Sequence, residues 1–501
     1  MTRSLKTIVI AGGGTAGWMT AAALSRHAPK DLSIVLVESE QIGTIGVGEA
    51  SIPPLTGFNQ LIGLEEATFM RDTGATFKLG IEFEGWLRPG DTYLHPFGTY
   101  GNALGLTPFH HAWLRAQALG HGGPVTGYSL NTLLSDQDRF LPPSTDPNSP
   151  QSAIGYAYHF DAGKYARLLR KMAESRGVAR IEGLIETVRQ NPDNGAIESL
   201  VLKDGRTLGG DLFVDCTGMR ASLIEGTLKS GFVDWSDEFP CDRAVAVQSE
   251  HEAVPRLRPY TRSIAMPAGW QWQIPLRHRV GNGLVYSSRH IGDDAAAAHV
   301  LANLPGKAST EPRLIRFRSG RRKAAWVKNC VAIGLSAGFL EPLESTSIHL
   351  IQKGALKLLQ YMPDQAMSAE LRNAFNRQTA EDYEDVKDFL ILHYKANLRE
   401  GEAFWDHCRH MPVSDRLAGR MALFRESGRL FIEQKELFKE ASWLAVMLGQ
   451  GLTPQGYDPL ADALPRDELL TRLDAMRALL KRTAGQAATH GEVLNRLFGL
   501  T

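Results

Sequence analysis

The alternation of apolar runs and glycine-rich turns near the N-terminus is the clearest pattern in the chain. The apolar run Thr7–Ala11 predicts a strand, the segment Gly12–Gly17 predicts a tight turn, and Trp18–Leu24 predicts a helix. A second apolar run, Ile34–Val37, predicts another strand that ends at Glu38. A strand, a glycine turn, a helix and a second strand in this order predict a βαβ unit.

The turn has GxGxxG spacing, with glycines at Gly12, Gly14 and Gly17. These glycines allow a tight turn and a close backbone approach, and the helix N-terminus offers N–H groups and a positive dipole to a pyrophosphate. Glu38 follows about 20 residues on, where a dinucleotide fold places a carboxylate for a ribose hydroxyl. GxGxxG alone is weak evidence and also occurs as an ordinary turn, but both strands and the acidic residue favour a dinucleotide site.

Two distant segments predict further strands of the same sheet. Leu212–Gly218 and Val331–Gly338 each read as a strand followed by a glycine turn. Between them and the N-terminal unit, the pattern predicts a helix over Lys164–Arg176 and a strand over Arg180–Val188. We therefore expect a dinucleotide domain whose chain is interrupted by other structure.

The hexapeptide Trp270-Gln271-Trp272-Gln273-Ile274-Pro275 predicts a strand of a second sheet. Two indoles two residues apart fall on one face of a strand and can form a stiff wall that excludes water. Taken alone, paired tryptophans in a strand are more often ordinary core residues.

From about Ser368 onward, the pattern becomes helical, with amphipathic stretches at Glu381–Lys395 and Leu430–Leu448. We therefore predict an α/β fold in two domains. Residues 1–367 form a dinucleotide-binding domain interleaved with the second sheet, and residues 368–501 form a mainly helical cap.

The composition narrows the classes of function. The chain has 501 residues and equal numbers of basic and acidic residues, 55 each, which argues against nucleic acid or an anionic membrane as the main partner. The four cysteines lack CxxC spacing, so no metal site or disulfide framework is expected, and a reducing cytoplasm is the simplest location. No apolar run is long enough to span a membrane.

Two further segments carry candidate chemistry. Lys78 lies in the apolar stretch Thr76–Ile81, where burial restrains a lysine and lowers its pKa. The segment Phe339–Leu350 follows the last glycine turn and contains Glu344. From its position alone, this glutamate can equally be a functional carboxylate or an ordinary solvated or helix-capping one. Backbone N–H groups near Thr346 and Ser347 can hold a small anion if a helix begins there. The glycine- and proline-rich stretch Gly46–Pro54 predicts a shaped loop, able to act as a lid.

With these motifs the sequence resembles the flavin-dependent tryptophan halogenases over nearly its whole length. The resemblance rests on the following motifs: GxGxxG at Gly12–Gly17, GVGEAxIP at Gly46–Pro53, Phe77-Lys78-Leu79-Gly80, WxWxIP at Trp270–Pro275, and the signature Phe339, Pro342, Ser345. It implies a box-like FAD domain with a pyramid-shaped helical cap. It also implies that hypohalous acid is made from reduced FAD, oxygen and chloride or bromide, and passes through a tunnel to an organic substrate.

The resemblance assigns roles to individual residues. Lys78 donates a hydrogen bond to hypohalous acid or carries the halogen as a haloamine, and Glu344 orients the electrophile or accepts the proton lost from the ring. The resemblance places the halide at Thr346 and Ser347. FAD contacts are expected at Gly12, Gly14, Thr15, Ala16, Gly17, Glu38, Val47, Ala50, Leu184, Leu335 and Ile348. The tunnel wall is expected at Trp270, Trp272, Ile274, Pro275 and Ser345.

The sequence departs from the family in two places that bear on specificity. The family signature ends in glycine where this chain has Ser347, which leaves the choice between chloride and bromide open.

His95, Phe97 and Trp443 match the aromatic residues that stack on the substrate. The positions that grip the charged ends of free tryptophan fall on or near Phe431, Ile432, Phe438 and Met447. Because apolar groups cannot compensate the desolvation of a zwitterion, we expect indole or an indole derivative as substrate rather than free tryptophan.

Two other functions remain open at this point. A flavin-dependent aromatic monooxygenase would use the same cofactor, although the two tryptophans argue against direct contact of substrate and flavin. A non-catalytic flavin-binding protein is the second alternative, against which the presence of Lys78 and Glu344 weighs. No second nucleotide fingerprint for NADH occurs, so we expect a separate flavin reductase as a transient partner. The resemblance implies that the chain itself is a monomer or a homodimer.

Overall fold

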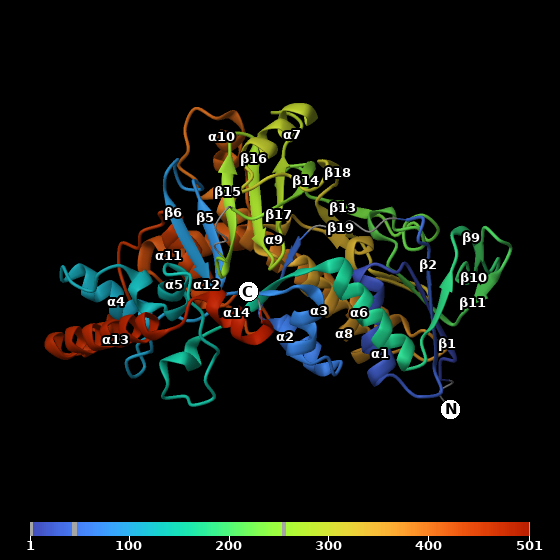
Figure 1. Cartoon of the computed structure of the whole chain (residues 1–501), viewed down its shortest axis with the longest axis horizontal. Coiled ribbons are helices and arrows are strands. Elements are labelled where there is room, and N and C mark those ends of the chain that lie inside the picture. The colour runs from blue at the N-terminus through green and yellow to red at the C-terminus, as the bar shows by residue number, and fades with distance from the viewer. Residues whose placement is uncertain (1–3, 43–47, 253–256, 500–501) are drawn as a thin grey trace. The chain divides into compact units, whose positions relative to one another are not determined.

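The computed structural model describes residues 4–42, 48–252 and 257–499 and is a mixed α/β protein (Figure 1). The chain forms two compact units, each built from three separate segments. Unit 1 comprises Met1–Ala75, Phe160–Asp242 and Arg316–Asp385, and unit 2 comprises Thr76–His159, Arg243–Ile315 and Val386–Thr501. The boundaries between these units lie at other positions than the expected domain boundary between residues 367 and 368. That domain boundary stays a prediction.

Unit 1 contains a six-stranded sheet in the order β20-β21-β12-β1-β2-β8. All neighbouring pairs are parallel except β20 with β21. Residues 8–11 of β1 are completely buried, which explains why this strand is a continuous apolar run rather than an alternating one. The bounds are β1 Thr7–Ala11, β2 Ser33–Glu38, β8 Ala179–Glu182, β12 Leu212–Asp215, β20 Trp326–Val327 and β21 Cys330–Ala332. The predicted dinucleotide sheet and its distant strands are confirmed.

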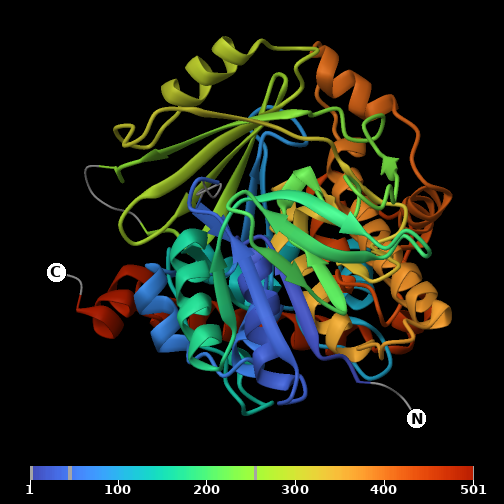
Figure 2. The same cartoon turned by 90° about the vertical axis from the view of Figure 1, so that its right-hand side faces the viewer.

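Helix α1 (Thr15–His27) packs between α6 (Ala162–Ser175) and α8 (Ser347–Gln360) (Figure 2). Residues 17–24 of this helix are buried all round, as expected of a helix covered by neighbours on several sides. The shorter helices α2 (Pro54–Leu61) and α3 (Glu66–Thr73) complete this part of unit 1.

The segment Arg180–Val188 was expected to be one strand, and that expectation is wrong. It is divided at Gly183 between β8 of the large sheet and β9 (Ile185–Gln190) of a small antiparallel sheet. A Cβ atom at Gly183 would lie 2.7 Å from Leu202 Cδ1, so the chain changes sheets at a point that packs closely against β10. The remaining small strands of unit 1 are β10 Ile197–Leu202, β11 Thr207–Gly209, β13 Phe232–Asp234, β19 Gly320–Arg322 and β22 Gly338–Phe339.

Unit 2 contains the predicted second sheet, with seven strands in the order β18-β14-β17-β16-β15-β5-β6 (Figure 1). The tryptophan-bearing strand is β16, and all seven of its residues are buried. The bounds are β5 Gly80–Glu84, β6 Thr92–Pro96, β14 Arg243–Ser249, β15 Tyr260–Met266, β16 Gly269–Pro275, β17 Val280–Tyr286 and β18 Arg313–Arg316. Separately, β4 (Thr76–Lys78) pairs antiparallel with β7 (Ala157–Asp161).

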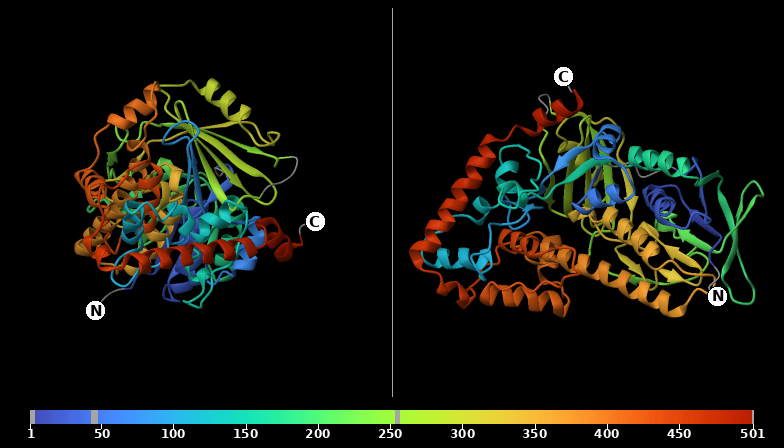
Figure 3. Two further views of the ribbon diagram at one scale, coloured as in Figure 1. Left: turned by 90° about the vertical axis from the view of Figure 1, so that its left-hand side faces the viewer. Right: turned by 90° about the horizontal axis from the view of Figure 1, so that it is seen from below.

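The C-terminal part of the chain is helical, as predicted. In unit 2, the long helix α13 packs along α4 and α5 (Figure 3). The bounds are α4 Phe109–Ala118, α5 Leu130–Ser135, α7 Asp293–Ala302, α9 Ala369–Lys395, α10 Ala403–His410, α11 Asp415–Ser427, α12 Glu440–Gly449, α13 Arg466–Gln486 and α14 His490–Phe498. Among residues 4–42, 48–252 and 257–499, no helix has the length and apolarity needed to cross a membrane.

Two local expectations are corrected by the structure. The stretch Leu430–Leu448 is helical only from Glu440, because residues 430–439 follow the left-handed Gly428, which ends α11, as an irregular segment. In the expected lid loop, Gly48–Ala50 form the short strand β3 and α2 begins at Pro54, whereas Gly46 and Val47 lie outside the described residues.

Candidate functional site

The glycine turn between β1 and α1 has the form that a phosphate site requires. Gly12 has a φ of +107°, and a Cβ there would lie 2.3 Å from the carbonyl oxygen of Cys216. A Cβ at Gly17 would lie 1.9 Å from the carbonyl oxygen of Gly12, whereas one at Gly14 would meet nothing within 4 Å. Gly14 is also the N-cap of α1 and supplies no side-chain cap. The turn is therefore closed by packing at two glycines and leaves the positive end of α1, with Thr15 and Ala16 in its first turn, available to an anion.

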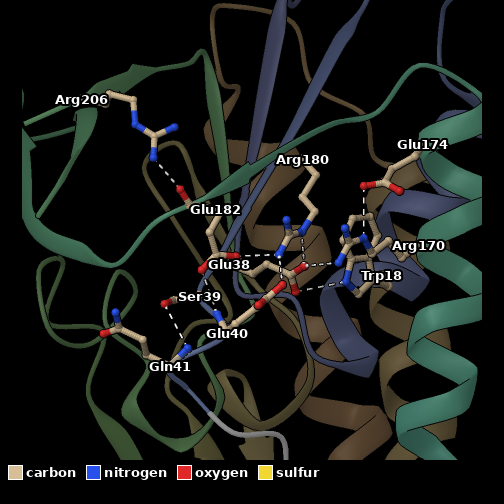
Figure 4. Close-up of polar contacts among 10 residues, drawn as sticks. All are labelled: Trp18, Glu38, Ser39, Glu40, Gln41, Arg170, Glu174, Arg180, Glu182 and Arg206. Atoms are coloured by element: carbon tan, nitrogen blue, oxygen red, sulfur yellow. Dashed lines mark hydrogen bonds and ion pairs between the residues drawn. The ribbon is translucent and has the colours of Figure 1, made fainter. Parts of the chain in front are cut away.

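Glu38, at the end of β2, is held above this turn by two arginines (Figure 4). Its carboxylate accepts a 2.5 Å hydrogen bond from Arg180 Nε and lies 3.5 Å from Arg170 Nη1. The indole N–H of Trp18 donates to the other oxygen at 3.3 Å. A Cβ at Gly13 would lie 1.5 Å from that oxygen, so the carboxylate is directly over the glycine turn. The position suits a ribose hydroxyl, whereas the two arginines could not be recognised from the sequence.

The later glycine segment lies beside the same turn. Gly334, with a φ of +77°, begins the short helix η4 (Gly334–Ser336), and a Cβ on it would lie 2.8 Å from the Cβ of Ala16. This contact places Leu335 near the first turn of α1. Leu184 lies just after Gly183, and its carbonyl oxygen accepts a hydrogen bond from the backbone N–H of Lys203 at 2.8 Å. Of the lid motif, Ala50 is buried in β3, and Val47 lies outside the described residues.

The segment that leads into α8 carries the predicted acid and anion site. Glu344 is completely buried at the end of the short helix η5 (Pro342–Glu344), and Ser345 follows in the left-handed conformation with a φ of +58°. Thr346 is the N-cap of α8, yet its side chain makes no capping bond. Its hydroxyl is buried and has no hydrogen-bond partner among the described residues. Ser347 and Ile348 form the first turn of α8, so a helix N-terminus with an unsatisfied buried hydroxyl lies where the sequence predicted a small anion.

Lys78 is completely buried at the end of β4. Its ammonium nitrogen lies 5.0 Å from the centroid of the Phe97 ring, within the range of a cation–π contact. The neighbouring His159 accepts or donates bonds of 3.0 Å to the hydroxyls of Thr76 and Thr261. Burial, with additional repulsion from Lys78 and His490, lowers the pKa of His159 well below its ordinary value, so this imidazole is neutral.

Aromatic side chains from three elements form a shell that includes the predicted substrate residues. The His95 ring lies 6.3 Å from Phe97, and it lies 5.6 Å from Phe389, which in turn lies 5.0 Å from Trp443. Phe438 stacks on Phe389 at 3.8 Å. The structure thus brings His95, Phe97 and Trp443 into one cluster. Phe389 was missed because a phenylalanine on an amphipathic helix looks like any core residue.

One face of Trp443 is covered by a side chain that the sequence did not reveal. The guanidinium of Arg420 lies 4.2 Å from the Trp443 ring centroid. Arg420 also forms a two-pronged ion pair with Glu436, at 2.9 and 2.8 Å, and donates to the carbonyl oxygen of Phe431. It therefore ties the irregular segment 428–439 to α11 and to Trp443.

The paired tryptophans form a packed wall within unit 2. Their ring centroids are 6.1 Å apart, and Trp270 and Trp272 are only 1% and 7% exposed. Trp272 lies against Gly283 of β17, where a Cβ would come within 2.1 Å of the indole. Ile274 is buried, and the carbonyl oxygen of Pro275 accepts a 2.7 Å bond from Thr76, which connects this strand to β4.

The segment before α12 borders a surface hollow of about 530 Å³. Its lining is mixed: Leu430, Phe431 and Ile432 are apolar, whereas Glu433, Gln434, Lys439 and Glu440 are polar or charged. Phe431 is 71% exposed, and Phe438 and Met447 are buried. The four apolar residues expected where the family grips the charged ends of free tryptophan therefore do not form one common surface: Phe431 and Ile432 line the hollow, whereas Phe438 and Met447 are buried. Among the described residues, no group of three or more histidine, cysteine, aspartate or glutamate side chains is placed to bind a metal ion.

Comparison with known proteins agrees with this arrangement. The tryptophan halogenase family model matches residues 7–466. Tryptophan 6-halogenase SttH of Streptomyces toxytricini is 35% identical over 515 residues, which cover 97% of this chain and 98% of the relative. A flavin-dependent halogenase from Xanthomonas campestris is 47% identical in sequence, with a TM-score of 0.94 over 99% of both chains. BrvH, a flavin-dependent halogenase from Brevundimonas sp. BAL3, is 46% identical, with a TM-score of 0.94 over 98% of this chain and 99% of the other. The chain therefore belongs to the tryptophan halogenase family and is a flavin-dependent halogenase.

Proposed function

We propose that this halogenase makes hypohalous acid from reduced FAD, oxygen and chloride or bromide, and uses it to halogenate an indole-type substrate. The observation that carries the proposal is Lys78, a completely buried lysine beside the ring of Phe97 and the aromatic shell. Burial of a lysine costs free energy, and such residues usually have a chemical role or a partner.

The FAD would be held by unit 1. Its pyrophosphate fits the open N-terminus of α1 at Gly14–Gly17, and its adenosine ribose fits the carboxylate of Glu38. Arg170 and Arg180 hold that carboxylate in place. Ala50, Leu184, Leu335 and Ile348 are proposed as further contacts, as is Val47, which lies outside the described residues. Reduced flavin, when bound, supplies the activation of oxygen.

The halide would bind at the N-terminus of α8. The buried hydroxyl of Thr346 and the backbone N–H groups of Thr346 and Ser347 offer hydrogen bonds to an anion with no side-chain cap competing for them. The side chain of Ser347 occupies space that a glycine would leave free and so changes the room for the halide. Chloride and bromide therefore both have to be tested. Ser345, in its left-handed conformation, sets the direction in which the chain enters the helix.

Lys78 and Glu344 are proposed to divide the remaining chemistry. Lys78 donates a hydrogen bond to hypohalous acid or carries the halogen on its nitrogen, and the aromatic shell around it keeps water away. Glu344 orients the electrophile or accepts the proton that the ring loses when the carbon–halogen bond forms. The wall of Trp270, Trp272, Ile274, Pro275 and Ser345 is proposed to border the path of the electrophile.

The substrate is proposed to stack against His95, Phe97 and Trp443. We infer that indole or an indole derivative is preferred to free tryptophan, because Phe438 and Met447 are buried apolar residues and offer nothing to a zwitterion. Lys439 and Glu440, which line the surface hollow before α12, are the charged groups that could pair with the carboxylate and the ammonium of free tryptophan and would then favour it as substrate. The relative from Streptomyces toxytricini is named for tryptophan, so a direct comparison of the two substrates is needed.

The test is product analysis by mass spectrometry with FAD, a flavin reductase, NADH and oxygen. Indole and tryptophan are each supplied with chloride or bromide in separate reactions. Mono-halogenated indole should form faster than halogenated tryptophan, and Lys78→Ala and Glu344→Gln should each lose most of this product. Lys78→Arg is the matched control: it keeps the cation and its hydrogen bonds but is not a nucleophilic amine, so its residual activity separates the two roles of Lys78.

Two outcomes would contradict the proposal. Oxygenated product formed without halide would indicate a monooxygenase, and equal turnover of tryptophan and indole would remove the substrate preference. The reductase is proposed as a separate, transient partner, and the oligomeric state, monomer or homodimer, follows from light scattering of the purified chain.

A further inference from the structure

The lysine strand β4 is the terminal strand of its sheet. It pairs antiparallel with β7, with Thr76 opposite His159, Phe77 opposite Tyr158 and Lys78 opposite Ala157. In an antiparallel ladder, alternate residues direct their N–H groups away from the partner strand. A terminal strand therefore has backbone donors that need a partner from elsewhere.

The imidazole of His490 supplies that partner. The backbone N–H of Phe77 donates to His490 Nε2 at 3.1 Å, across a sequence separation of 413 residues. The other ring nitrogen, Nδ1, lies 2.8 Å from the carbonyl oxygen of Leu257. A carbonyl only accepts and an amide N–H only donates, so Nδ1 must carry the hydrogen and Nε2 the lone pair.

The surroundings of His490 keep the ring in this state. It is completely buried, and burial lowers its pKa to about 4, so it is neutral at physiological pH. The neutral imidazole of His159 lies close enough to interact with His490 electrostatically. Phe77 stacks on Phe140 at 4.0 Å, and both of their rings lie 6.1 Å from the imidazole.

The backbone of His490 is fixed as firmly as its side chain. It is the first residue of α14, and its N–H donates to the carbonyl oxygen of Asp138 at 2.7 Å. Thr489 and Glu492 form a reciprocal capping box at this helix end. The position of the imidazole is therefore set by the C-terminal helix.

The chain on the other side of Lys78 is also anchored. The N–H of Leu79 donates to the carbonyl oxygen of Pro259 at 2.6 Å, and the carbonyl oxygen of Leu79 accepts from Asn131 Nδ2 and from the N–H of Phe97, each at 2.9 Å. Lys78 is thus flanked by backbone hydrogen bonds on both sides. The bond to Phe77 comes from His490, and those to Leu79 come from Pro259, Asn131 and Phe97. Of these, only the bond from His490 comes from the C-terminal helix.

We propose that His490 is a positioning residue for Lys78, so that helix α14 fixes the place at which the electrophile is captured. This inference rests on the proposed function of Lys78. The imidazole touches neither substrate nor cofactor in this role. It acts through the Phe77 amide, and its loss lets the lysine strand move, so that hypohalous acid is still made but escapes capture.

Two substitutions separate the hydrogen bond from the bulk of the ring. His490→Gln places an amide oxygen near the position of Nε2 and can still accept from Phe77. His490→Asn is shorter, reaches only the position of Nδ1, and leaves the Phe77 N–H without its acceptor. An unpaired buried amide is expected to exchange its hydrogen about 10- to 100-fold faster.

The experiment measures where the electrophile goes. Each full-length variant is supplied with reduced FAD, oxygen, bromide and indole, in the presence of taurine, whose amine traps free hypohalous acid. The ratio of halogenated taurine to halogenated indole is compared at equal oxygen consumption, with Lys78→Met as the reference for complete escape. We expect His490→Asn to shift this ratio at least about 10-fold toward the reference, and His490→Gln to stay near the wild type.

Hydrogen exchange of the peptide that contains residues 76–79 is measured on the same samples, because it does not depend on activity. Faster exchange in His490→Asn with an unchanged product ratio would overturn the proposal, as would equal ratios for Asn and Gln. If His490→Asn does not fold, Glu492→Ala, which opens only the capping box, should raise escape by a smaller factor, and an unchanged ratio would again overturn it. A wild type that halogenates neither taurine nor indole would refute the proposed function instead, and the exchange difference would still report on the strand.

Discussion

The ion pair between Arg420 and Glu436 gives the most quantitative prediction. The two side chains are 10% and 4% exposed, and they meet through two hydrogen bonds of 2.9 and 2.8 Å. Although burial alone would raise the pKa of Glu436, the bonds from Arg420 and from the backbone N–H of Glu433 lower it below the ordinary value. The carboxylate is therefore charged at neutral pH and depends on Arg420.

Replacing Arg420 by Met would leave this charge buried without its partner. Breaking a buried ion pair in this way costs about 3–5 kcal/mol, and loss of the cation–π contact with Trp443 adds to it. Since about 1.4 kcal/mol corresponds to a factor of ten, local opening of the segment 428–439 should become roughly 100- to 4,000-fold more frequent. The sign with pH follows from the lowered pKa: the stabilisation is present above the unfolded pKa of about 4.3 and is lost as the pH falls through the lower folded value.

Hydrogen exchange of the Glu433 amide is the direct assay, because this N–H donates to Glu436 at 2.9 Å. Arg472→Met is the matched control, since Arg472 pairs with Glu468 on the surface of α13, where the two side chains are 53% and 43% exposed. That change should cost about 0.5 kcal/mol or less. The double variant Arg420→Met with Glu436→Leu should recover most of the lost stability, measured by thermal melting because the Glu433 N–H has no side-chain acceptor in that variant. Equal effects of Arg420→Met and Arg472→Met, or a double variant as damaged as the single one, would refute the reasoning.

The remaining predictions concern unit 1. Gly17→Ala should abolish stable folding of the FAD site, because its methyl group would lie 1.9 Å from a backbone oxygen, whereas Gly14→Ala meets nothing within 4 Å and should keep the fold but weaken FAD binding. Thermal melting and FAD titration check both, and a Gly14→Ala protein that melts as early as Gly17→Ala would contradict the geometry. Burial, and then the charge of Asp161, raise the pKa of Glu49 to about 7, so wild-type stability should fall by up to about 3 kcal/mol as the pH rises from the ordinary glutamate range through 7. Glu49→Gln should remove this dependence, and melting curves at pH 5 and pH 8 that shift equally for both proteins would show that Glu49 does not titrate there.

The sequence alone was sufficient where short-range sterics decide the structure. The turn at Gly12–Gly17 can be read from its glycines, because the close backbone approaches at Gly12 and Gly17 exclude any other residue. The strand β1 was predictable because a strand buried on both faces needs an unbroken run of apolar residues. The strand Trp270–Pro275 was predictable from the alternation of its side chains, although its two glutamines are buried as well. The helical character of the C-terminal part followed from its period.

The sequence was misleading where a local pattern had to compete with contacts from elsewhere. The stretch Arg180–Val188 has a strand pattern throughout, but its first half pairs with β2 and its second half with β10, so the strand is divided at Gly183. The stretch Leu430–Leu448 has a helical period, yet its first ten residues are held as an irregular segment by Arg420. In both cases tertiary interactions outweigh a local preference of a few tenths of a kcal/mol per residue.

Only the tertiary structure could show which residues support the candidate site. Lys78 was visible in the sequence as a lysine in an apolar stretch, but nothing in the sequence connects it to His490, 412 positions later. Arg180 and Arg420 look like ordinary surface arginines until their carboxylate partners are seen. The physical reason is that a hydrogen bond or ion pair depends on distance in space, and each compact unit is assembled from three segments that are far apart in the chain. The sequence therefore determined which chemical groups are present and the local turns that present them, whereas the packing of distant segments determined which of these groups are held in place.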